Sequence, residues 1–521
     1  MTGERAKLPT HTRGAANLVR RNLHIHSNMT SDTIVLMTNV PMSKALRYVD
    51  VLVIGAGLSG VGAACRLRKT GRTYAVLEAR ARLGGTWDLF RYPGVRSDSD
   101  MFTLSYPFQP WRGSKSLADG DSIRRYIEET AREHGIDRHI HCGVKMVAAA
   151  WSSKQSLWVV ETEEDGQARM WTCAFLYICA GYYDYEHGHQ PDFAGLDAFT
   201  GQFVHPQFWP DDLDVTGRRV VVIGSGATAV TLIPALARTA KKVTMLQRSP
   251  TYLASLPEVD RVADALRRCL PPRLAHAVIR GKNVLNSQLT YWLSRRFPEQ
   301  TKRHLRAAIL RHLPDPGYLE RHFTPRYQPW DQRLCVVPDG DFFREVTAGR
   351  AAVVTDRIAR FAEHGIVLES GAILEADVVV CATGLSLIPL GGIHLSVDGR
   401  TVDVAQTTAY RGLMLSGVPN LAFCVGYTNA SWTLRADLSS RYVVRLLGHM
   451  RRRGLTLAMP ARPSGEARRP LLGLTSTYIQ RAAHLFPQQG ERDPWTVGQN
   501  YLLDRARFPF LDLRKGMVFD D

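Results

Sequence analysis

The chain of 521 residues is 45% hydrophobic and 22% charged, proportions that exclude collagenous, intrinsically disordered and disulfide-scaffold proteins. No apolar stretch approaches the roughly 20 residues that cross a bilayer as a helix. The 66 Lys and Arg residues against 49 Asp and Glu leave a formal charge of +17, but no nucleic-acid recognition motif accompanies this charge, so we expect no nucleic-acid partner.

The first 46 residues differ from the rest of the chain. They contain six Lys or Arg residues against Glu4 and Asp32 and have no sustained hydrophobic period. A targeting segment is the alternative, but the apolar patch at 33–40 has polar breaks and no clear cleavage pattern. We interpret residues 1–46 as a disordered leader.

From residue 47 onward, short β-branched runs alternate with helical patterns, which is typical of parallel strands joined by crossover helices. The first unit places Gly55, Gly57 and Gly60 in a GxGxxG spacing after a strand, and its second strand ends at Glu78. The glycines allow a tight turn, a close approach to a pyrophosphate and close helix packing, and the acid can accept hydrogen bonds from ribose hydroxyls. This unit predicts a dinucleotide site.

A second glycine fingerprint begins at Gly224, after the strand 220–223. Its second strand, 242–247, ends without a carboxylate and is followed by Arg248 and Ser249, which offer a cation and a hydroxyl to a 2′-phosphate. An Arg248 that only lies on the surface is the alternative. We predict an NADP site, and two dinucleotide sites in one chain indicate electron transfer between a flavin and a nicotinamide. The expected NADP contacts are Ser225, Gly226, Ala227, Thr228, Arg248 and Ser249.

Between the fingerprints, Phe199, Gly201, His205 and Trp209 follow the spacing FxGxxxHxxxW. This segment resembles the signature of type I Baeyer–Villiger monooxygenases, whereas related N- and S-oxidising flavin-containing monooxygenases usually end it with Tyr or Phe. The chain is most similar to actinobacterial FAD-containing monooxygenases of the ethionamide-activating type. Further matches follow in chain order, at residues 84–98, 329–335, 380–384, 426–432 and 487–490.

The resemblance implies an α/β fold with two Rossmann-like dinucleotide-binding domains, for FAD and NADP, and a helical subdomain. We expect the NADP domain to be inserted into the FAD domain. The expected boundaries are 47–185 and 346–521 for the two parts of the FAD domain, 186–345 for the NADP domain, and about 258–313 for a helical insertion that shapes the substrate pocket.

The resemblance also implies the reaction. NADPH reduces FAD, O2 adds at flavin C4a, and the resulting peroxide converts a ketone into an ester or lactone, with sulfoxidation as a side activity. Two alternatives stay open: an S- or N-oxygenating monooxygenase acting on thioamides, thioethers or amines, and an uncoupled NADPH oxidase or catalytically silent binding protein. No metal is expected, and the oligomeric state stays open.

Site residues are carried over by their match to the family motifs. Arg333 matches the active-site arginine beside the flavin, and Asp98 matches the aspartate that holds it; a plain turn aspartate is the alternative. Gln332 departs from the family, whose ketone-oxidising members often have a lysine there that holds the 2′-phosphate. His205 is expected to couple the two nucleotide domains. Arg96 and Ser97 are expected on the nicotinamide side. The expected FAD contacts are Gly55, Gly57, Gly60, Glu78, Thr86, Trp87, Asp88, Leu89, Asp98 and Met146, with ordinary core as the alternative for Trp87.

A basic segment at 295–311 predicts an amphipathic helix with Leu305 and Ile309 on its apolar side. We interpret it as a solvated helix face, with contact to a membrane surface as the alternative. The eight cysteines include no CxxC pair, which argues against a flavin disulfide reductase and favours a reducing compartment. We therefore expect a cytoplasmic protein. Peripheral attachment to the inner face of the cell membrane is the alternative.

Overall fold

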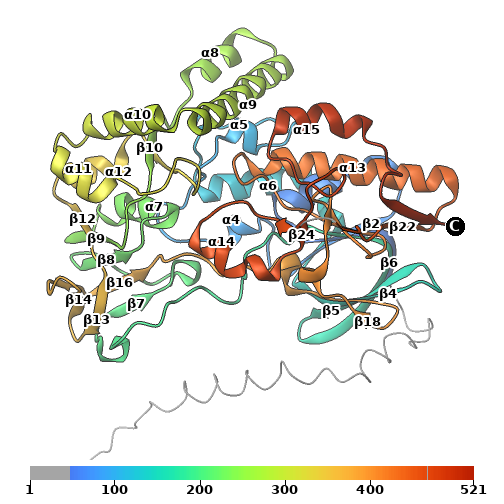
Figure 1. The fold of residues 1–521 in the computed structure, drawn as a ribbon, viewed down its shortest axis with the longest axis horizontal. Coiled ribbons are helices and arrows are strands. Elements are labelled where there is room, and N and C mark those ends of the chain that lie inside the picture. Colours follow the sequence, from blue (N-terminus) through green and yellow to red (C-terminus); the bar gives the residue numbers. More distant parts are fainter. Residues whose placement is uncertain (1–46, 466–467) are drawn as a thin grey trace, which may run out of the picture.

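The computed structural model describes residues 47–465 and 468–521, so the leader expected at 1–46 lies outside the described residues. Two β-sheets stand side by side, with helices packed over them (Figure 1). The fold class predicted from the sequence requires two sheets, each with its own glycine fingerprint, and both are present among the described residues.

The first sheet has eleven strands and contains the first glycine fingerprint. Its central strand β1 lies parallel to β2 on one side and to β6 on the other. Val51 to Ile54 are buried, as expected for a strand covered on both faces. Its strands are β1 (Arg47–Ile54), β2 (Tyr74–Glu78), β3 (Ile140–Cys142), β4 (Val144–Ser152), β5 (Leu157–Glu164), β6 (Gln167–Ile178), β17 (His394–Val397), β18 (Arg400–Thr401), β19 (Ala409–Tyr410), β20 (Met414–Leu415) and β21 (Leu421–Phe423).

The second sheet is parallel throughout and contains the second glycine fingerprint. Its strand order is β12 (Ala351–Thr355), β9 (Lys242–Gln247), β8 (Arg219–Ile223), β16 (Val378–Cys381) and β7 (Gln202–Val204). A three-stranded sheet has the order β13 (Ile358–Ala362), β14 (Gly365–Leu368) and β15 (Ile373–Glu375). Three two-stranded sheets pair β10 (Leu253–Leu256) with β11 (Cys335–Pro338), β22 (Leu457–Pro460) with β25 (Met517–Asp520), and β23 (Arg469–Pro470) with β24 (Gln488–Gln489).

The strand pairing corrects one expected domain boundary. Strands β12 and β16 lie within 346–521, the segment assigned to the second part of the FAD domain, but they pair with β9 and β8 of the second sheet. The chain returns to the first sheet only at β17. The segment that builds the second sheet therefore runs from β7 to β16, beyond the expected end at residue 345.

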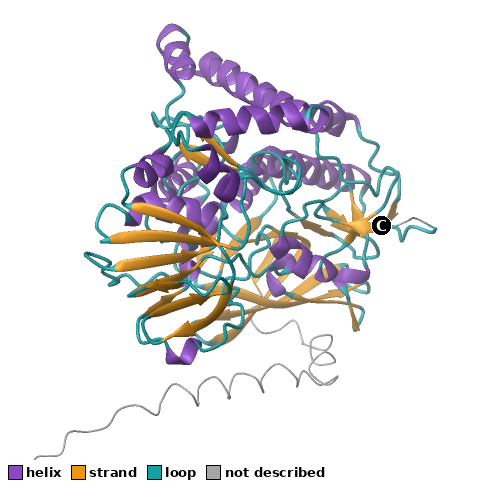
Figure 2. Cartoon of the chain, turned by 60° about the vertical axis from the view of Figure 1, so that its left-hand side comes forward, coloured by secondary structure: helices purple, strands orange, loops and turns teal. Residues whose placement is uncertain are grey.

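Helices cover both sheets and form a projection at one end of the molecule (Figures 1 and 2). The projection consists of α8 and α9, followed by α10 and α11, in the region where a helical insertion was expected. The helices are α3 (Leu58–Leu67), α4 (Thr86–Leu89), α5 (Met101–Leu104), α6 (Gly120–Glu133), α7 (Ala227–Leu236), α8 (Arg261–Cys269), α9 (Pro272–Arg296), α10 (Pro298–Leu310), α11 (Pro316–Phe323), α12 (Asp341–Thr347), α13 (Trp432–Arg453), α14 (Thr477–Ala482) and α15 (Tyr501–Arg507).

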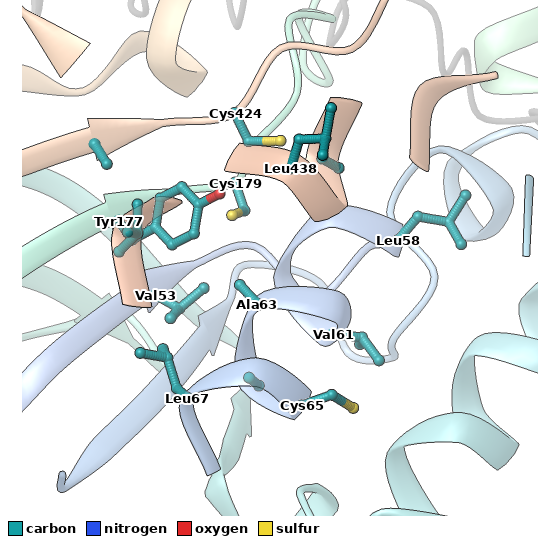
Figure 3. Packing of buried hydrophobic residues seen from close by; sticks show 14 of the residues in the cluster. Val53, Leu58, Val61, Ala63, Cys65, Leu67, Tyr177, Cys179, Cys424 and Leu438 are labelled. Atoms are coloured by element: carbon teal, nitrogen blue, oxygen red, sulfur yellow. The ribbon is translucent and has the colours of Figure 1, made fainter. Parts of the chain in front are cut away.

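A hydrophobic core fixes helix α3 against the first sheet. Val53 of β1, Ala63 of α3, Tyr177 of β6 and Leu438 of α13 are all buried in it (Figure 3). Burial of apolar surface of this kind contributes roughly 25 cal/mol per Å² to folding. The core therefore holds the start of α3, and with it the first glycine turn, in a fixed position.

Candidate active site

A cavity of about 1920 Å³ lies where the carboxyl ends of the parallel strands of both sheets meet. Residues from both glycine turns line it, together with the loop that carries Arg333. In open α/β sheets, ligands bind outside the carboxyl ends of the strands, so the cavity is the expected place for both nucleotides.

The first glycine turn forms a close-fitting cradle. Gly55 has φ +96°, a conformation that favours glycine. A Cβ on Gly60 would lie 1.8 Å from the carbonyl oxygen of Gly55, and one on Gly57 would lie 3.4 Å from the Cα of Gly85. Gly55 and Gly57 line the cavity, whereas Gly60 packs the helix against the turn. The cradle fits a pyrophosphate bound through backbone N–H groups at the start of α3.

Glu78 is buried at the end of β2 and lines the cavity. One carboxylate oxygen, Oε2, accepts a hydrogen bond from the N–H of Ala56 (2.7 Å), and Oε1 accepts one from the N–H of Arg80 (3.0 Å). Burial raises the pKa of this carboxyl group above its ordinary value. The carboxylate is thus fixed beside the glycine turn, where a ribose is expected. Met146 of β4 also lines the cavity.

Only some of the residues of α4 that were expected to contact the flavin line the cavity. Thr86 and Trp87 line the cavity, but Asp88 and Leu89, which were also expected at the flavin, do not. The Asp88 carboxylate is buried and forms ion pairs with Arg80 (2.7 Å) and Arg82 (2.9 Å), and Leu89 belongs to the core beneath the second sheet. Asp88 therefore holds neighbouring arginines in place.

The second glycine turn opens into the same cavity. Gly224 has φ +130°, and a Cβ there would lie 2.3 Å from the carbonyl oxygen of Ala382. Arg248 and Ser249 follow β9 at the cavity wall, and the exposed Arg248 side chain has no ion-pair or hydrogen-bond partner among the described residues. An unpartnered cation at this position fits a 2′-phosphate. The expected NADP contacts all line the cavity, including Ser225, Gly226, Ala227 and Thr228.

A second cation at this wall, Arg357, was missed by the sequence analysis. Thr355 of β12 pairs with Gln247 of β9, so the register brings Arg357 next to the loop that carries Arg248. Arg357 is exposed and lines the cavity. Its position two residues after a β-branched run is the only sequence signal, and that signal is useful only once the strand pairing is known.

Arg96 and Ser97 line the cavity on the opposite side, but both side chains are already engaged. Arg96 forms an ion pair with Asp341 at the start of α12 (Nη1 to Oδ2, 2.5 Å). The Ser97 hydroxyl donates a hydrogen bond to the carbonyl oxygen of Ser99 (2.7 Å). The Arg96–Asp341 ion pair links two distant segments of the chain, whereas the Ser97 bond is local to its own turn.

Arg333 and Asp98 meet inside the cavity. Nη1 of Arg333 lies 3.7 Å from Oδ2 of Asp98, and the two side chains are 35% and 32% exposed. The negative charge of Asp98 raises the pKa of the Arg333 guanidinium above its ordinary value, so the group stays protonated. The pair brings together residues 235 positions apart in the chain, as the sequence analysis expected.

Three tyrosines surround this ion pair, and the sequence analysis did not identify them. Tyr182, Tyr183 and Tyr478 line the cavity and interact electrostatically with Arg333. The ring of Tyr182 lies 5.2 Å from that of Trp432, centroid to centroid, which extends the aromatic wall. Tyr182 and Tyr183 lie in a loop and Tyr478 in the distant helix α14, so only the fold reveals this wall.

The loop before Arg333 is held by helix α9. Nη1 of Arg295 lies 2.6 Å from Oδ1 of Asp331, and the ring of Tyr291 packs 5.4 Å from that of Trp330. Within the described chain, none of the residues of α8 to α11 lines the cavity. The helical insertion therefore supports the cavity wall indirectly, through this loop and through α5, where Arg280 of α9 binds backbone carbonyls on either side of the cavity residue Leu104. That the insertion shapes the substrate pocket stays a prediction.

The FxGxxxHxxxW segment lies behind the cavity wall. Phe199, Gly201, His205 and Trp209 do not line the cavity. Burial lowers the pKa of His205, and its Nδ1 accepts a hydrogen bond from the N–H of Gln207 (3.2 Å). The Gln207 side chain donates to the carbonyl oxygen of Asp184 (2.8 Å), which belongs to the cavity wall between the two sheets.

The comparisons with known proteins agree with this architecture. The sequence profile of the flavin-binding monooxygenase-like family matches residues 48–390. The FAD-containing monooxygenase EthA of Mycobacterium tuberculosis (strain ATCC 25618 / H37Rv) is 49% identical over 478 residues, which cover 91% of this chain and 97% of EthA.

Two solved structures share the fold. An oxidized steroid monooxygenase bound to NADP has a TM-score of 0.71 and 23% identity, and an open structure of cyclohexanone monooxygenase has a TM-score of 0.70 and 21% identity. Each comparison covers 91% of this chain and 100% of the other. The predicted fold class and family resemblance are confirmed, and the chain belongs to the flavin-binding monooxygenase-like family.

Proposed function

We propose that the protein is an FAD- and NADPH-dependent monooxygenase that inserts one oxygen atom of O2 into ketones, giving esters or lactones. Sulfoxidation is its side activity, and the cytoplasm is its location. The observation that carries the proposal is the Arg333–Asp98 ion pair, which faces the cavity into which both glycine turns open.

The residues divide the work between two nucleotides. Gly55, Gly57 and Glu78 hold FAD at the first sheet, and Ser225 and Arg248 are among the groups that hold NADPH at the second. FAD, when bound, supplies the two-electron and O2 chemistry that side chains lack. The protein supplies position, charge and exclusion of water.

Arg333 provides a positive charge that stays in place through the reaction. A permanently protonated guanidinium stabilises an oxyanion without donating a proton to it. Asp98 orients the guanidinium and partly offsets its positive charge. Tyr182, Tyr183 and Tyr478 keep bulk water from the reacting carbonyl. These roles need no acid or base that titrates near neutral pH.

A competition experiment tests the substrate class. Holoenzyme is supplied with NADPH, O2 and an equimolar ketone and thioether, and the products are identified by mass. We expect ester or lactone from the ketone together with some sulfoxide. Sulfoxide alone across a broad ketone panel would assign the protein to the sulfur-oxidising alternative, and NADPH consumption that yields only hydrogen peroxide would reject the monooxygenase.

Cofactor selectivity gives a second prediction. Because Gln332 replaces a lysine at the family's phosphate site, we propose that Arg248 and Arg357 share the 2′-phosphate. Arg248→Ala and Arg357→Ala should each raise KM for NADPH about 10-fold or more, as expected for loss of a charge-assisted hydrogen bond of roughly 1.5–3 kcal/mol. KM for NADH should change little.

Arg238→Ala is the matched control, since Arg238 is exposed at the end of α7 and does not line the cavity. Steady-state kinetics with both cofactors provides the measurement. An equal rise in KM for NADPH and NADH would remove the phosphate role from the residue concerned.

A further inference from the structure

Helix α9 belongs to the projection at one end of the molecule (Figures 1 and 2). One side of this helix carries an exposed apolar stripe. Leu274, Val278, Leu285, Leu289 and Trp292 are 50%, 41%, 59%, 49% and 56% exposed. Their spacings of four, seven, four and three residues place them within roughly 60° of one another around the helix. We call these five side chains the α9 stripe.

The opposite side of α9 attaches the helix to the protein. Ala275 and Ile279 are buried in a small core with Phe102. Arg280, also buried, donates hydrogen bonds to the carbonyl oxygens of Phe102 and Ser105 (2.8 Å each). Because these contacts hold α9 from the other side, the stripe has no role in fixing the helix. Isolated exposed apolar residues are ordinary, but a continuous exposed stripe indicates a binding surface.

Positive charge surrounds the stripe. The sequence contains no Asp or Glu from residue 265 to residue 298. Arg268, Arg273 and Arg296 are exposed and form no ion pair with any described residue. Asp264, the acid of α8, is occupied by an ion pair with Arg267. The surface is therefore apolar along its centre and cationic at both ends.

We propose that the α9 stripe and its arginines bind the surface of an anionic lipid bilayer. Some helices lie flat in the interface between water and the bilayer, with their apolar side buried at the boundary of the lipid acyl chains. Such a helix has leucines and a tryptophan on one face and arginines beside them. The arginines then contact lipid phosphates. None of the helices in residues 47–465 and 468–521 is long and apolar enough to cross a bilayer, so the contact is peripheral.

Charge argues against a second copy of the chain as the occupant. Two copies related by a two-fold axis would present the same surface to each other. The arginines at the ends of α9 would then face arginines, with no carboxylate on the stripe to neutralise them. Anionic headgroups supply that neutralisation.

The lipid-binding surface differs from the one considered in the sequence analysis. The helix predicted at 295–311 corresponds to α10, whose apolar residues Leu305 and Ile309 are buried. That helix presents a solvated face, as expected. The contact with a membrane surface that was considered for the helix at 295–311 is proposed here for α9, which the sequence analysis did not identify.

Flotation of the FAD-loaded full chain with vesicles tests the proposal. We expect binding to vesicles of phosphatidylcholine mixed with phosphatidylglycerol, weak binding to phosphatidylcholine alone, and a decrease with added salt. The double variant Leu285→Ser/Leu289→Ser should lower the partition coefficient more than about ten-fold, since two apolar side chains no longer insert. Arg273→Glu/Arg296→Glu should lower it by more than about five-fold per charge lost.

Matched controls lie on surfaces far from α9. Ile373→Ser changes a 64% exposed side chain on β15, and Arg400→Glu changes an exposed arginine on β18. Both should bind vesicles like the wild type. Absence of binding to anionic vesicles, or equal binding by the leucine double variant, would overturn the proposal. Light scattering that detects a wild-type dimer converted to a monomer by the leucine substitutions would assign the stripe to a second copy instead.

Discussion

Replacement of Arg333 by alanine should abolish ester and sulfoxide formation while NADPH still reduces the bound flavin. Removal of one fixed electrostatic stabiliser from an active site commonly costs about 10²- to 10³-fold in rate. Arg333 faces the cavity 3.7 Å from Asp98, whereas the expected NADPH phosphate contacts lie at the end of β9. The substitution therefore separates oxygen transfer from flavin reduction.

Anaerobic stopped-flow absorbance measures flavin reduction, and product mass measures oxygen transfer. In the variant, NADPH consumed under air should appear as hydrogen peroxide. Arg333→Lys keeps the charge but not the planar fork, so it should recover part of the product yield. Arg326→Ala is the control, because Arg326 is exposed on the same connecting segment and outside the cavity lining. Undiminished ester yield from Arg333→Ala would place the oxygenation centre elsewhere.

The features predicted correctly from the sequence are those whose physical cause is local. A glycine turn, the helix that follows it and the residue at the end of the next strand lie within about 30 residues of one another, so the spacing alone defines the geometry. The positions of Gly55, Gly57 and Glu78 at the cavity follow from this. Asp98 and Arg333 were predicted from the family resemblance, because a local sequence pattern cannot show that residues so far apart in the chain lie close together.

The features that were missed depend on pairings between distant segments. The sequences of strands β12 and β16 do not show which of the two sheets each strand joins. Their sheet is known only from the strands to which they are hydrogen-bonded. Arg357 is a cavity residue because β12 lies beside β9. The exposed stripe on α9 was missed for a related reason: periodicity defines an apolar face but does not tell whether another element covers it.

Gly60→Ala should produce a protein that no longer retains FAD. The added Cβ would lie 1.8 Å from the carbonyl oxygen of Gly55 and 2.9 Å from its carbonyl carbon. Both partners are backbone atoms, so no side-chain rotation relieves the clash, and α3 must move away from β1. Overpacking of this kind costs about 1–3 kcal/mol or more. The movement also withdraws the start of α3, whose N–H groups are expected to hold the pyrophosphate.

Flavin absorbance per polypeptide after gel filtration, together with the unfolding temperature with and without added FAD, measures both effects. Gly281→Ala is the matched control, because a Cβ on Gly281 of α9 meets no atom within 4 Å; alanine favours the helix there by roughly 0.5–1 kcal/mol. The second fingerprint already has alanine at the equivalent position, Ala229, which is buried. The penalty at Gly60 is thus specific to the tighter first turn. A Gly60→Ala protein with a full complement of flavin and the wild-type unfolding temperature would show that α3 has room to shift and that the first turn is not the rigid cradle deduced from its geometry.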